Sequence, residues 1–474
     1  MRTNLLLSFF LAIALLSGFL ISQYPPTILI SVTLALAVFI VSFVKIEWGL
    51  YILIFSMLLS PEITIGDTNV TSLNRGVTLR FEDILLAVIG FSWFAKNAVN
   101  KELGLFLKTP LNKAILLYIS ACLISTFIGI LEDRVATKTG ILYVIKYVEY
   151  FTVYFMVVNH LKHPDQIKRF VFCMFLTCFI ISIFGILQIP GGERVSAPFE
   201  GKTAEPNTLG GYLLFIGVIA AGLLIKTENK RLRYALIFLV IIIVPPFLFT
   251  QSRSSFLALI PACLVLGALT EKRIIVLGLL SVIFILSPFF LPSSIKERLL
   301  YTFNQPETFG QITIGELHLD TSTSARIASL KAVLRDFPKH PIVGYGVTGY
   351  GFTDSQFLRI PIETGIFGLI TFAYLLYSIL KLSIIRLRQV RVPYFKGLVV
   401  GFLAGFIGLL FHSVGANTFI IVRIMEPFWF FAGIIAVLPE LEAKQQEQPQ
   451  EDHPRIRRFA SAKTSFPTNP RLQS

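Results

Sequence analysis

Apolar runs of about 20 residues, separated by short polar breaks, recur from Leu5 to Leu438. Each run is long enough to cross a bilayer as a helix, because a hydrocarbon core of about 30 Å needs roughly 20 mostly apolar residues. Hydrophobic residues make up 54% of the 474 residues and charged residues only 15%, and a soluble core of this length would not use so many apolar side chains. The sequence therefore predicts an all-α, polytopic integral membrane protein.

We expect about 12 to 14 transmembrane helices by this length criterion. The first run is preceded by one Arg and followed by no clear small-residue cleavage site, so it is interpreted as a helix rather than a signal peptide. The expected spans are residues 5–22, 26–44, 46–60, 82–98, 113–131, 140–159, 167–189, 207–225, 232–249, 254–270, 273–291, 358–380, 397–415 and 419–438.

The distribution of Lys and Arg predicts the orientation, because these residues resist translocation and collect in cytoplasmic breaks. With the N-terminus inside, most cations of the breaks fall on the cytoplasmic side: Lys45, Lys96, Lys101, Lys108, Lys113, Lys162, Lys168, Arg169, Lys226, Lys230, Arg231, Arg233, Lys272, Arg273, Lys381, Arg386, Arg388, Arg391 and Lys396. An even number of spans leaves both termini in the cytoplasm. The net charge of +14 then anchors the protein at the inner headgroups, so nucleic acid is not an expected partner.

Two regions are expected: a polytopic membrane domain over residues 1–440 and a tail over 441–474. The tail is rich in Gln, Glu, Pro and Arg and has few apolar residues to bury, which predicts a disordered cytoplasmic extension. The four Cys lie inside apolar runs without a C-x-x-C spacing and are interpreted as small buried hydrophobes. The six His show no zinc-binding spacing, so neither a metal nor another cofactor is predicted.

The larger outer loop, about residues 292–357, contains an amphipathic helix. Its apolar residues recur at spacings of three and four: Ile327, Leu330, Leu334 and Phe337. Ser322 or Thr323 is expected to cap the start, and Pro338 to stop the helix. The cations Arg326, Lys331 and Arg335 lie off the stripe, which suits a lipid headgroup or a phosphate, although an ordinary solvated face explains Lys331 and Arg335 better. Arg326 lies near the helix N-terminus, where the dipole favours anions.

Arg253 interrupts two apolar runs and has only a few polar neighbours in the sequence. An ionisable residue at membrane depth is costly and so is a functional candidate, and a snorkelling loop Arg is the alternative. Upstream, Pro206 and Asn207 are typical of a helix N-terminus, with Gly210 and Gly211 allowing close packing just inside it.

Two pairs of intramembrane charges are spaced three residues apart, Lys146 with Glu149 and Arg423 with Glu426. Residues at this spacing share one helix face, so mutual neutralisation explains them, and an ion or proton path is the alternative. His412, at the end of a span, is interpreted as a hydrogen-bonded structural residue.

Several stretches in order resemble the bacterial O-antigen ligase and O-antigen polymerase superfamily. They are "EPNTLGGYL", "SRSSFLAL", "SARIASLKAVLRDFPKHPIVGYG" and "DSQFLRIPIETGIFGLI", with weaker support from "LRFEDILL". The resemblance covers roughly residues 200–440. It implies a metal-independent glycosyltransferase of the bacterial inner membrane, which uses undecaprenyl or similar polyprenyl diphosphate-linked sugars outside the cytoplasm.

The resemblance also assigns roles to individual residues. Arg253 and Arg326 match the family's arginines associated with the donor diphosphate, and guanidinium groups can stabilise the departing charge without a metal. Ligases of the family place a His where this chain has Asp354, whereas polymerase-like members carry Asp, which favours a polymerase. Asp354 would accept or orient the proton of the acceptor hydroxyl, and an Asx cap is its alternative role.

His340 is the second candidate for this base. The loop around it, rich in Gly and Tyr, is expected to roof the site, with Tyr345, Tyr350, Arg359 and Glu363 as candidates for holding sugar. Phe352 could also stack on a sugar ring. A plain flexible loop is the alternative interpretation, because glycines alone do not exclude it.

The expected function is therefore polymerisation of lipid-linked repeat units for O-antigen, capsule or exopolysaccharide, with the large loop outside the cytoplasm. Expected partners are the polyprenyl-diphosphate-linked glycan, membrane lipid, and a flippase and chain-length regulator of the same pathway. An O-antigen ligase is the first alternative. A transporter of a solute or a lipid-linked sugar is the second, and a scaffold subunit for polysaccharide export is the third.

Overall fold

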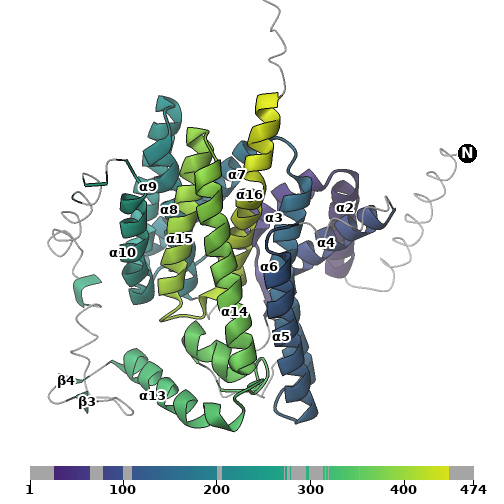
Figure 1. The fold of residues 1–474 in the computed structure, drawn as a ribbon, viewed down its shortest axis with the longest axis vertical. Coiled ribbons are helices and arrows are strands. Elements are labelled where there is room, and N and C mark those ends of the chain that lie inside the picture. The colour runs from purple at the N-terminus through teal and green to yellow at the C-terminus, as the bar shows by residue number, and fades with distance from the viewer. Residues whose placement is uncertain are drawn as a thin grey trace, which may run out of the picture.

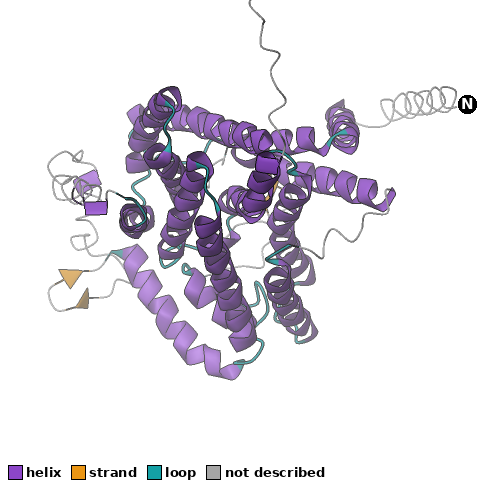
Figure 2. Ribbon diagram, turned by 45° about the horizontal axis from the view of Figure 1, so that its top comes forward, coloured by secondary structure: helices purple, strands orange, loops and turns teal. Residues whose placement is uncertain are grey.

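The computed structural model describes residues 26–64, 78–99, 109–199, 205–271 and 320–447 except residue 352, together with short pieces between 273 and 318. Helices form almost all of this part of the chain, and the strands are only two or three residues long (Figure 2). The fold is an all-α, polytopic membrane protein, as the apolar runs predicted.

The helices follow the expected spans closely. They are α2 (Pro26–Val44), α3 (Ile46–Leu59), α4 (Phe81–Val99), α5 (Asn112–Leu131), α6 (Thr137–His160), α7 (Pro164–Gln188), α8 (Pro206–Lys226), α9 (Lys230–Phe249), α10 (Arg253–Ala268), α13 (Thr321–Asp336), α14 (Gln356–Gln389), α15 (Pro393–His412) and α16 (Val422–Glu447). Single 3₁₀ turns lie at η2 (Ile189–Gly191), η4 (Phe337–Lys339) and η5 (Thr418–Ile420). The expected span 5–22 and nearly all of 273–291 lie outside the described residues.

Two antiparallel ribbons complete the described secondary structure: β1 (Glu62–Thr64) pairs with β2 (Thr78–Arg80), and β3 (Thr313–Ile314) with β4 (Leu317–His318). Glu62 lies opposite Arg80 in the first ribbon. The end of this ribbon leads directly into α4, so β2 fixes where α4 begins.

Eight of the described helices are long and apolar enough to cross a membrane, namely α5, α6, α7, α8, α9, α14, α15 and α16. The apolar helices α3 and α10 and the described side chains of α2 form shorter segments. Large apolar side chains remain exposed on nearly every helix, such as Phe91 at 65% and Leu116 at 66%, and a lipid environment would cover them.

The core of the bundle is formed by α8, α15 and α16, whose most apolar windows are 78%, 72% and 89% buried. Glycines allow α8 and α15 to pack closely, because a Cβ on Gly222 would meet the backbone of Gly401 at 2.5 Å. Trp429 of α16 packs on the rings of Tyr150 and Phe151 of α6. By contrast, only 28% of the most apolar 18-residue stretch of α9 is buried, so α9 lies at the periphery.

The amphipathic helix predicted in the large loop is α13, and it lies across one end of the bundle, below α10, α14 and α15 in Figure 1. We call this end the α13 face. The chain leaves α16 at the opposite end of the molecule (Figure 1). Helix α16 continues to Glu447, past the expected start of the tail at 441, and residues 448–474 lie outside the described residues.

The predicted cap of α13 was wrong. Asp320, rather than Ser322 or Thr323, is the N-cap residue, and its Oδ1 accepts a hydrogen bond from the Thr323 N–H at 3.2 Å. The helix ends at Asp336, just before the 3₁₀ turn that contains Pro338. Leu330 and Leu334 of its apolar stripe are 40% and 66% exposed, whereas Ile327 and Phe337 are half-buried, so only part of this stripe packs on the bundle.

Candidate functional site

Two ion pairs lie together at the α13 face. The Arg253 Nη2 contacts the Asp320 Oδ2 at 2.5 Å, and the Arg326 Nη2 contacts the Asp354 Oδ2 at 3.2 Å. We call these four residues the Arg326 cluster. They come from the start of α10, the start of α13 and the segment before α14, so three separate parts of the sequence build the cluster.

Asp320 connects the two helices that supply the arginines. Its carboxylate caps α13 and also pairs with Arg253, the first residue of α10. A cation at a helix N-terminus opposes the helix dipole, so an acidic partner is needed at that position. Burial raises the pKa of Asp320, but hydrogen bonds from Arg253 and Thr323 outweigh burial and hold the pKa below its ordinary value.

Arg326 bridges α13 to the turn that follows α15. Its Nη2 donates to the Gly415 carbonyl at 2.8 Å in addition to contacting Asp354. The side chains of Arg326 and Asp354 are 25% and 35% exposed, so the pair is reachable from the α13 face. The residue at 415 must be small, because a Cβ there would overlap the Ser254 hydroxyl.

The segment that carries Asp354 is fixed to the same turn by hydrogen bonds on both sides. The Asn417 Nδ2 donates to the Thr353 carbonyl at 2.7 Å, and the Gln356 N–H donates to the Ser413 carbonyl at 3.1 Å. The Gln356 side chain in turn accepts from the Phe419 N–H at 3.2 Å. These bonds hold Asp354 in place next to Arg326, although 28 residues separate the two in the sequence.

A buried hydrogen-bonded network lies beneath the cluster. The His412 Nε2 is 3.1 Å from the Ser255 Oγ and its Nδ1 is 2.8 Å from the Thr418 Oγ1. Ser255 donates to Ser252, which donates to the Asn207 Oδ1 at 2.8 Å. His412 is thus a hydrogen-bonded structural residue, as its position in the sequence indicated. The network links the starts of α8 and α10 to the end of α15.

The glycine-rich loop, residues 341–351, completes a break in α14. Gly365 has φ 65° and ψ −166°, so α14 consists of two helices that meet at this residue. Backbone bonds from the loop satisfy the break: the Gly346 N–H donates to Glu363 O, and the Ile366 N–H donates to Pro341 O. The loop is therefore packed against α14, and its glycines serve this close approach, because a Cβ on Gly344 would meet the Glu363 carbonyl at 2.5 Å.

Arg359 and Glu363 support this loop from within. They pair with each other at 3.0 Å and are 9% and 5% exposed. Glu363 also accepts the Thr348 N–H at 3.1 Å, and the Arg359 guanidinium lies over the Tyr143 ring. The two side chains thus neutralise each other, and Glu363 also binds the backbone of the loop.

The tyrosines gather at the other end of α13. Tyr345 donates to the Asp336 carbonyl and Tyr350 to the Asp336 Oδ2, and the His340 ring packs edge-on against Tyr345 at 4.6 Å. Hydrogen bonds from Arg335, Lys339 and Tyr350 hold the pKa of Asp336 well below its usual range. Burial and the Asp336 carboxylate raise the pKa of Tyr350 to about 12.

The predicted site residues therefore fall into two groups. Arg253, Arg326 and Asp354 come together, whereas His340, Tyr345 and Tyr350 lie near Asp336, ten residues further along α13, or about 15 Å along a helix axis. Sequence reasoning missed Asp320, although an Asp directly before "TSTSAR" is a recognisable N-cap signal. It also missed Gly415 and Asn417, for which no local signal exists.

A comparison of the sequence with known protein families matches the region that holds these contacts. Residues 240–373 match the family model described as O-antigen ligase. This region contains α10, α13, the glycine-rich loop and the first half of α14, and so it includes all four residues of the Arg326 cluster. No curated protein matches the chain. Residues 240–373 of this protein are thus similar to the O-antigen ligase family.

Proposed function

We propose that this protein polymerises polyprenyl-diphosphate-linked oligosaccharide repeat units by glycosyl transfer at the outer face of the bacterial inner membrane. The observation that carries the proposal is the pairing of Asp354 with Arg326 of helix α13, whose N-cap residue Asp320 pairs with Arg253. Two guanidinium groups and a carboxylate within one reachable cluster are the groups that departure of a diphosphate and deprotonation of a hydroxyl require.

Arg253 and Arg326 would bind the donor diphosphate. Each guanidinium is held by a carboxylate in this structure, and a diphosphate carries more negative charge than the carboxylate it would displace. The N-terminus of α10 adds N–H groups that favour an anion at the same place. The negative charge that develops on the departing phosphate oxygen would thus be stabilised by groups already in position.

Asp354 would accept the proton of the acceptor hydroxyl as that oxygen attacks the anomeric carbon of the donor. When the diphosphate engages Arg326, the Asp354 carboxylate is released from its ion pair and can face the acceptor. We favour Asp354 over His340, because the His340 ring packs on Tyr345 near Asp336, at the other end of α13. An Asp at this position, where ligases carry His, also supports a polymerase.

The half-exposed rings of Tyr345 and Tyr350 could stack on sugar units further from the reacting bond. Arg359 and Glu363 would contribute indirectly, because they are buried and hold the glycine-rich loop. A growing glycan would thus extend along α13. The donor would arrive from a flippase, and a chain-length regulator would act on the product.

The test compares the lengths of the glycans, seen as a ladder of bands on a gel, in cells that carry the wild type, Arg253→Ala, Arg326→Ala or Asp354→Ala. The amount of each protein in the membrane is matched. Lys331→Ala is the control, because Lys331 is an exposed cation of the same helix. We expect the three cluster variants to produce only single repeat units and the control to produce the full ladder. An unchanged ladder in all three variants would reject the proposal. A transporter or a scaffold subunit would then be the alternatives to test.

The family description favours ligation as the second function. The same experiment separates the two activities. If the cluster variants still make full-length polymer, but the polymer stays on its polyprenyl carrier, the protein is a ligase.

A further inference from the structure

Four carboxyl groups from three helices gather inside the membrane-spanning bundle, away from the Arg326 cluster. They are Glu82 and Asp83 at the start of α4, Glu149 of α6 and Glu426 of α16, and we call them the buried carboxyl cluster. All four lie outside the region that matches the family model, residues 240–373. The proposed glycosyl transfer uses none of them.

The cations near this cluster pair between helices. Lys146 contacts the Asp83 Oδ2 at 3.0 Å, and Glu82 is 3.4 Å from the Arg80 Nη1 and 4.0 Å from the Arg423 Nε. Arg423 also donates to the carbonyls of Pro198 and Ser60. Lys146 and Arg423 thus also pair with acidic residues of α4, beyond the neutralisation expected within each helix.

Glu426 differs from the other members. It is fully buried, and neither of its carboxylate oxygens has a hydrogen-bond partner in the part of the chain that the structure describes. The acidic residues Glu82, Asp83 and Glu149 act on it from neighbouring helices, and the basic residues near the cluster are Arg80 and, one turn earlier on α16, Arg423. An ionised carboxylate that is buried without a hydrogen-bond partner is very costly.

Basic groups also lie at this cluster. Arg80 and Arg423 contact Glu82, and Lys146 contacts Asp83, whereas the Glu426 oxygens accept no hydrogen bond in the described part of the chain. Among the described residues, no group of His, Cys, Asp and Glu has an arrangement that could hold a metal ion.

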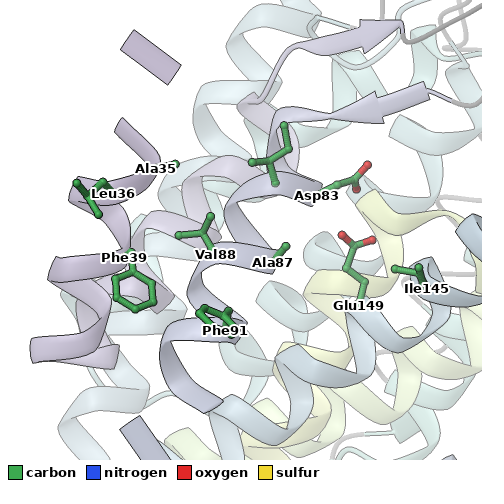
Figure 3. Close-up of a pocket in the computed structure, with 10 residues that line it drawn as sticks. Ala35, Leu36, Phe39, Asp83, Ala87, Val88, Phe91, Ile145 and Glu149 are labelled. Carbon is green, nitrogen blue, oxygen red and sulfur yellow. The ribbon is translucent and has the colours of Figure 1, made fainter. Parts of the chain in front are cut away.

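A groove of about 640 Å³ reaches the cluster from the side of α2, α4 and α6. It is lined by apolar side chains such as Phe39, Val88 and Phe91, together with Asp83 and Glu149. Figure 3 shows Asp83 and Glu149 pointing toward one another at one end of this otherwise apolar surface. These two carboxyls are therefore the point at which the cluster meets the surroundings of the protein.

We infer that the buried carboxyl cluster is a proton-binding site, in which Glu426 holds the proton and Glu149 and Asp83 exchange it through the groove between α2, α4 and α6. The inference rests on the burial of Glu426, its unpartnered oxygens and the groove. It does not depend on the proposed glycosyl transfer.

Infrared difference spectroscopy on the full-length protein in lipid nanodiscs tests the bound proton directly, because a protonated carboxyl has a C=O band separate from those of carboxylates. We expect this band at neutral pH in the wild type and its loss in Glu426→Gln. Glu271→Gln is the control, since the Glu271 side chain is 88% exposed and should leave the band unchanged. Absence of the band in the wild type, or its persistence in Glu426→Gln, would overturn the inference.

A second measurement uses the linkage between proton binding and folding stability. Folding that places a proton on Glu426 makes the unfolding midpoint fall as pH rises, and the amide of Glu426→Gln mimics the protonated side chain. We expect a midpoint that decreases between pH 5 and 9 in the wild type and a smaller decrease in Glu426→Gln, measured with choline as the only cation. If sodium removes the pH dependence of the wild type, a metal cation occupies the site and the proton assignment is wrong.

The exchange route has its own test. After transfer to D2O, the C=O band of the protonated carboxyl shifts in the wild type as deuterium replaces the proton. Glu149→Gln should slow this shift. Equal rates in both proteins would reject exchange through the groove.

Discussion

At the residue scale, the site depends on two side chains, Asp320 and Arg326, that each contact two partners. Asp320 caps α13 and holds Arg253, and Asp354 shares Arg326 with the carbonyl of Gly415. Such shared contacts make the arginines both oriented and exchangeable, because an incoming diphosphate replaces one ion pair with another.

Arg326→Lys should reduce polymer formation although it keeps the charge. A Lys is a flexible point charge without the planar fork of Arg, so it cannot reproduce the bridge between Asp354 and Gly415. A charged hydrogen bond is worth about 1.5–3 kcal/mol, so we expect a loss of about tenfold to a hundredfold in the rate of polymer formation in isolated membranes. Lys331→Arg on the same helix should leave that rate unchanged. A wild-type rate in Arg326→Lys would show that its charge alone is sufficient.

Two substitutions at Asp320 should separate its two roles. Asn caps helices as well as Asp does, so Asp320→Asn should keep the first turn of α13, whereas Asp320→Ala should lose about 1 kcal/mol there. Both remove the carboxylate that pairs with Arg253. Hydrogen exchange of α13 should therefore accelerate only in the Ala variant, while polymer formation falls in both. Equal exchange in the two variants would contradict the cap.

Acid should loosen the same turn. Because the pKa of Asp320 is lowered in the folded protein, its stabilisation is complete above the unfolded value of about 3.9 and is lost as pH falls through the lower folded value. We expect protection of the first turn of α13 to decrease below about pH 4 in the wild type. Asp320→Asn should show no such decrease in that turn, and an identical acid response would assign the effect to another group.

At the element scale, the important feature is the break in α14. Gly365 ends the short helix that carries Arg359 and Glu363 and begins the long helix that crosses the bundle. The glycine-rich loop supplies the hydrogen bonds that the break leaves open. The loop, α13 and the start of α14 thus form one packed unit at the α13 face.

Gly365→Ala should destabilise this unit strongly. Its φ of 65° is unfavourable for Ala by about 1–2 kcal/mol, and the added methyl would also overlap the Ile342 carbonyl. Gly351→Ala is the matched control in the same loop, because no atom lies within 4 Å of the added Cβ. We expect a lower unfolding midpoint and less protein in membranes for Gly365→Ala alone. Equal midpoints would mean that the loop does not depend on the break.

At the scale of the whole molecule, the α13 face and the end of α16 lie on opposite sides (Figure 1). This arrangement agrees with the alternation of Lys and Arg along the sequence, which assigns the large loop to the outside and the C-terminal end to the cytoplasm. With this orientation, the proposed glycan chemistry and the C-terminal end of the chain would lie on different sides of the membrane.

Labelling with a membrane-impermeant thiol reagent tests this orientation. Lys331→Cys on α13 should react in intact spheroplasts, and Lys444→Cys near the end of α16 should react only after the membrane is opened, because both positions are exposed but lie at opposite ends. The unmodified protein is the control for its four free cysteines, two buried and two half-buried. Reaction of Lys444→Cys alone in intact cells would invert the topology.

The sequence by itself determined the helices of the described part of the chain and supplied the candidate site residues. Apolar runs and the spacing of Ile327, Leu330 and Leu334 depend only on neighbouring residues, so span positions and α13 could be predicted. Arg253, Arg326 and Asp354 were identified through resemblance. Only the tertiary structure decided their partners: Asp320 lies 67 residues from Arg253, and Lys146 and Arg423 contact acidic residues of α4. Such contacts depend on how helices pack, and helix packing leaves no periodic signal in a single sequence.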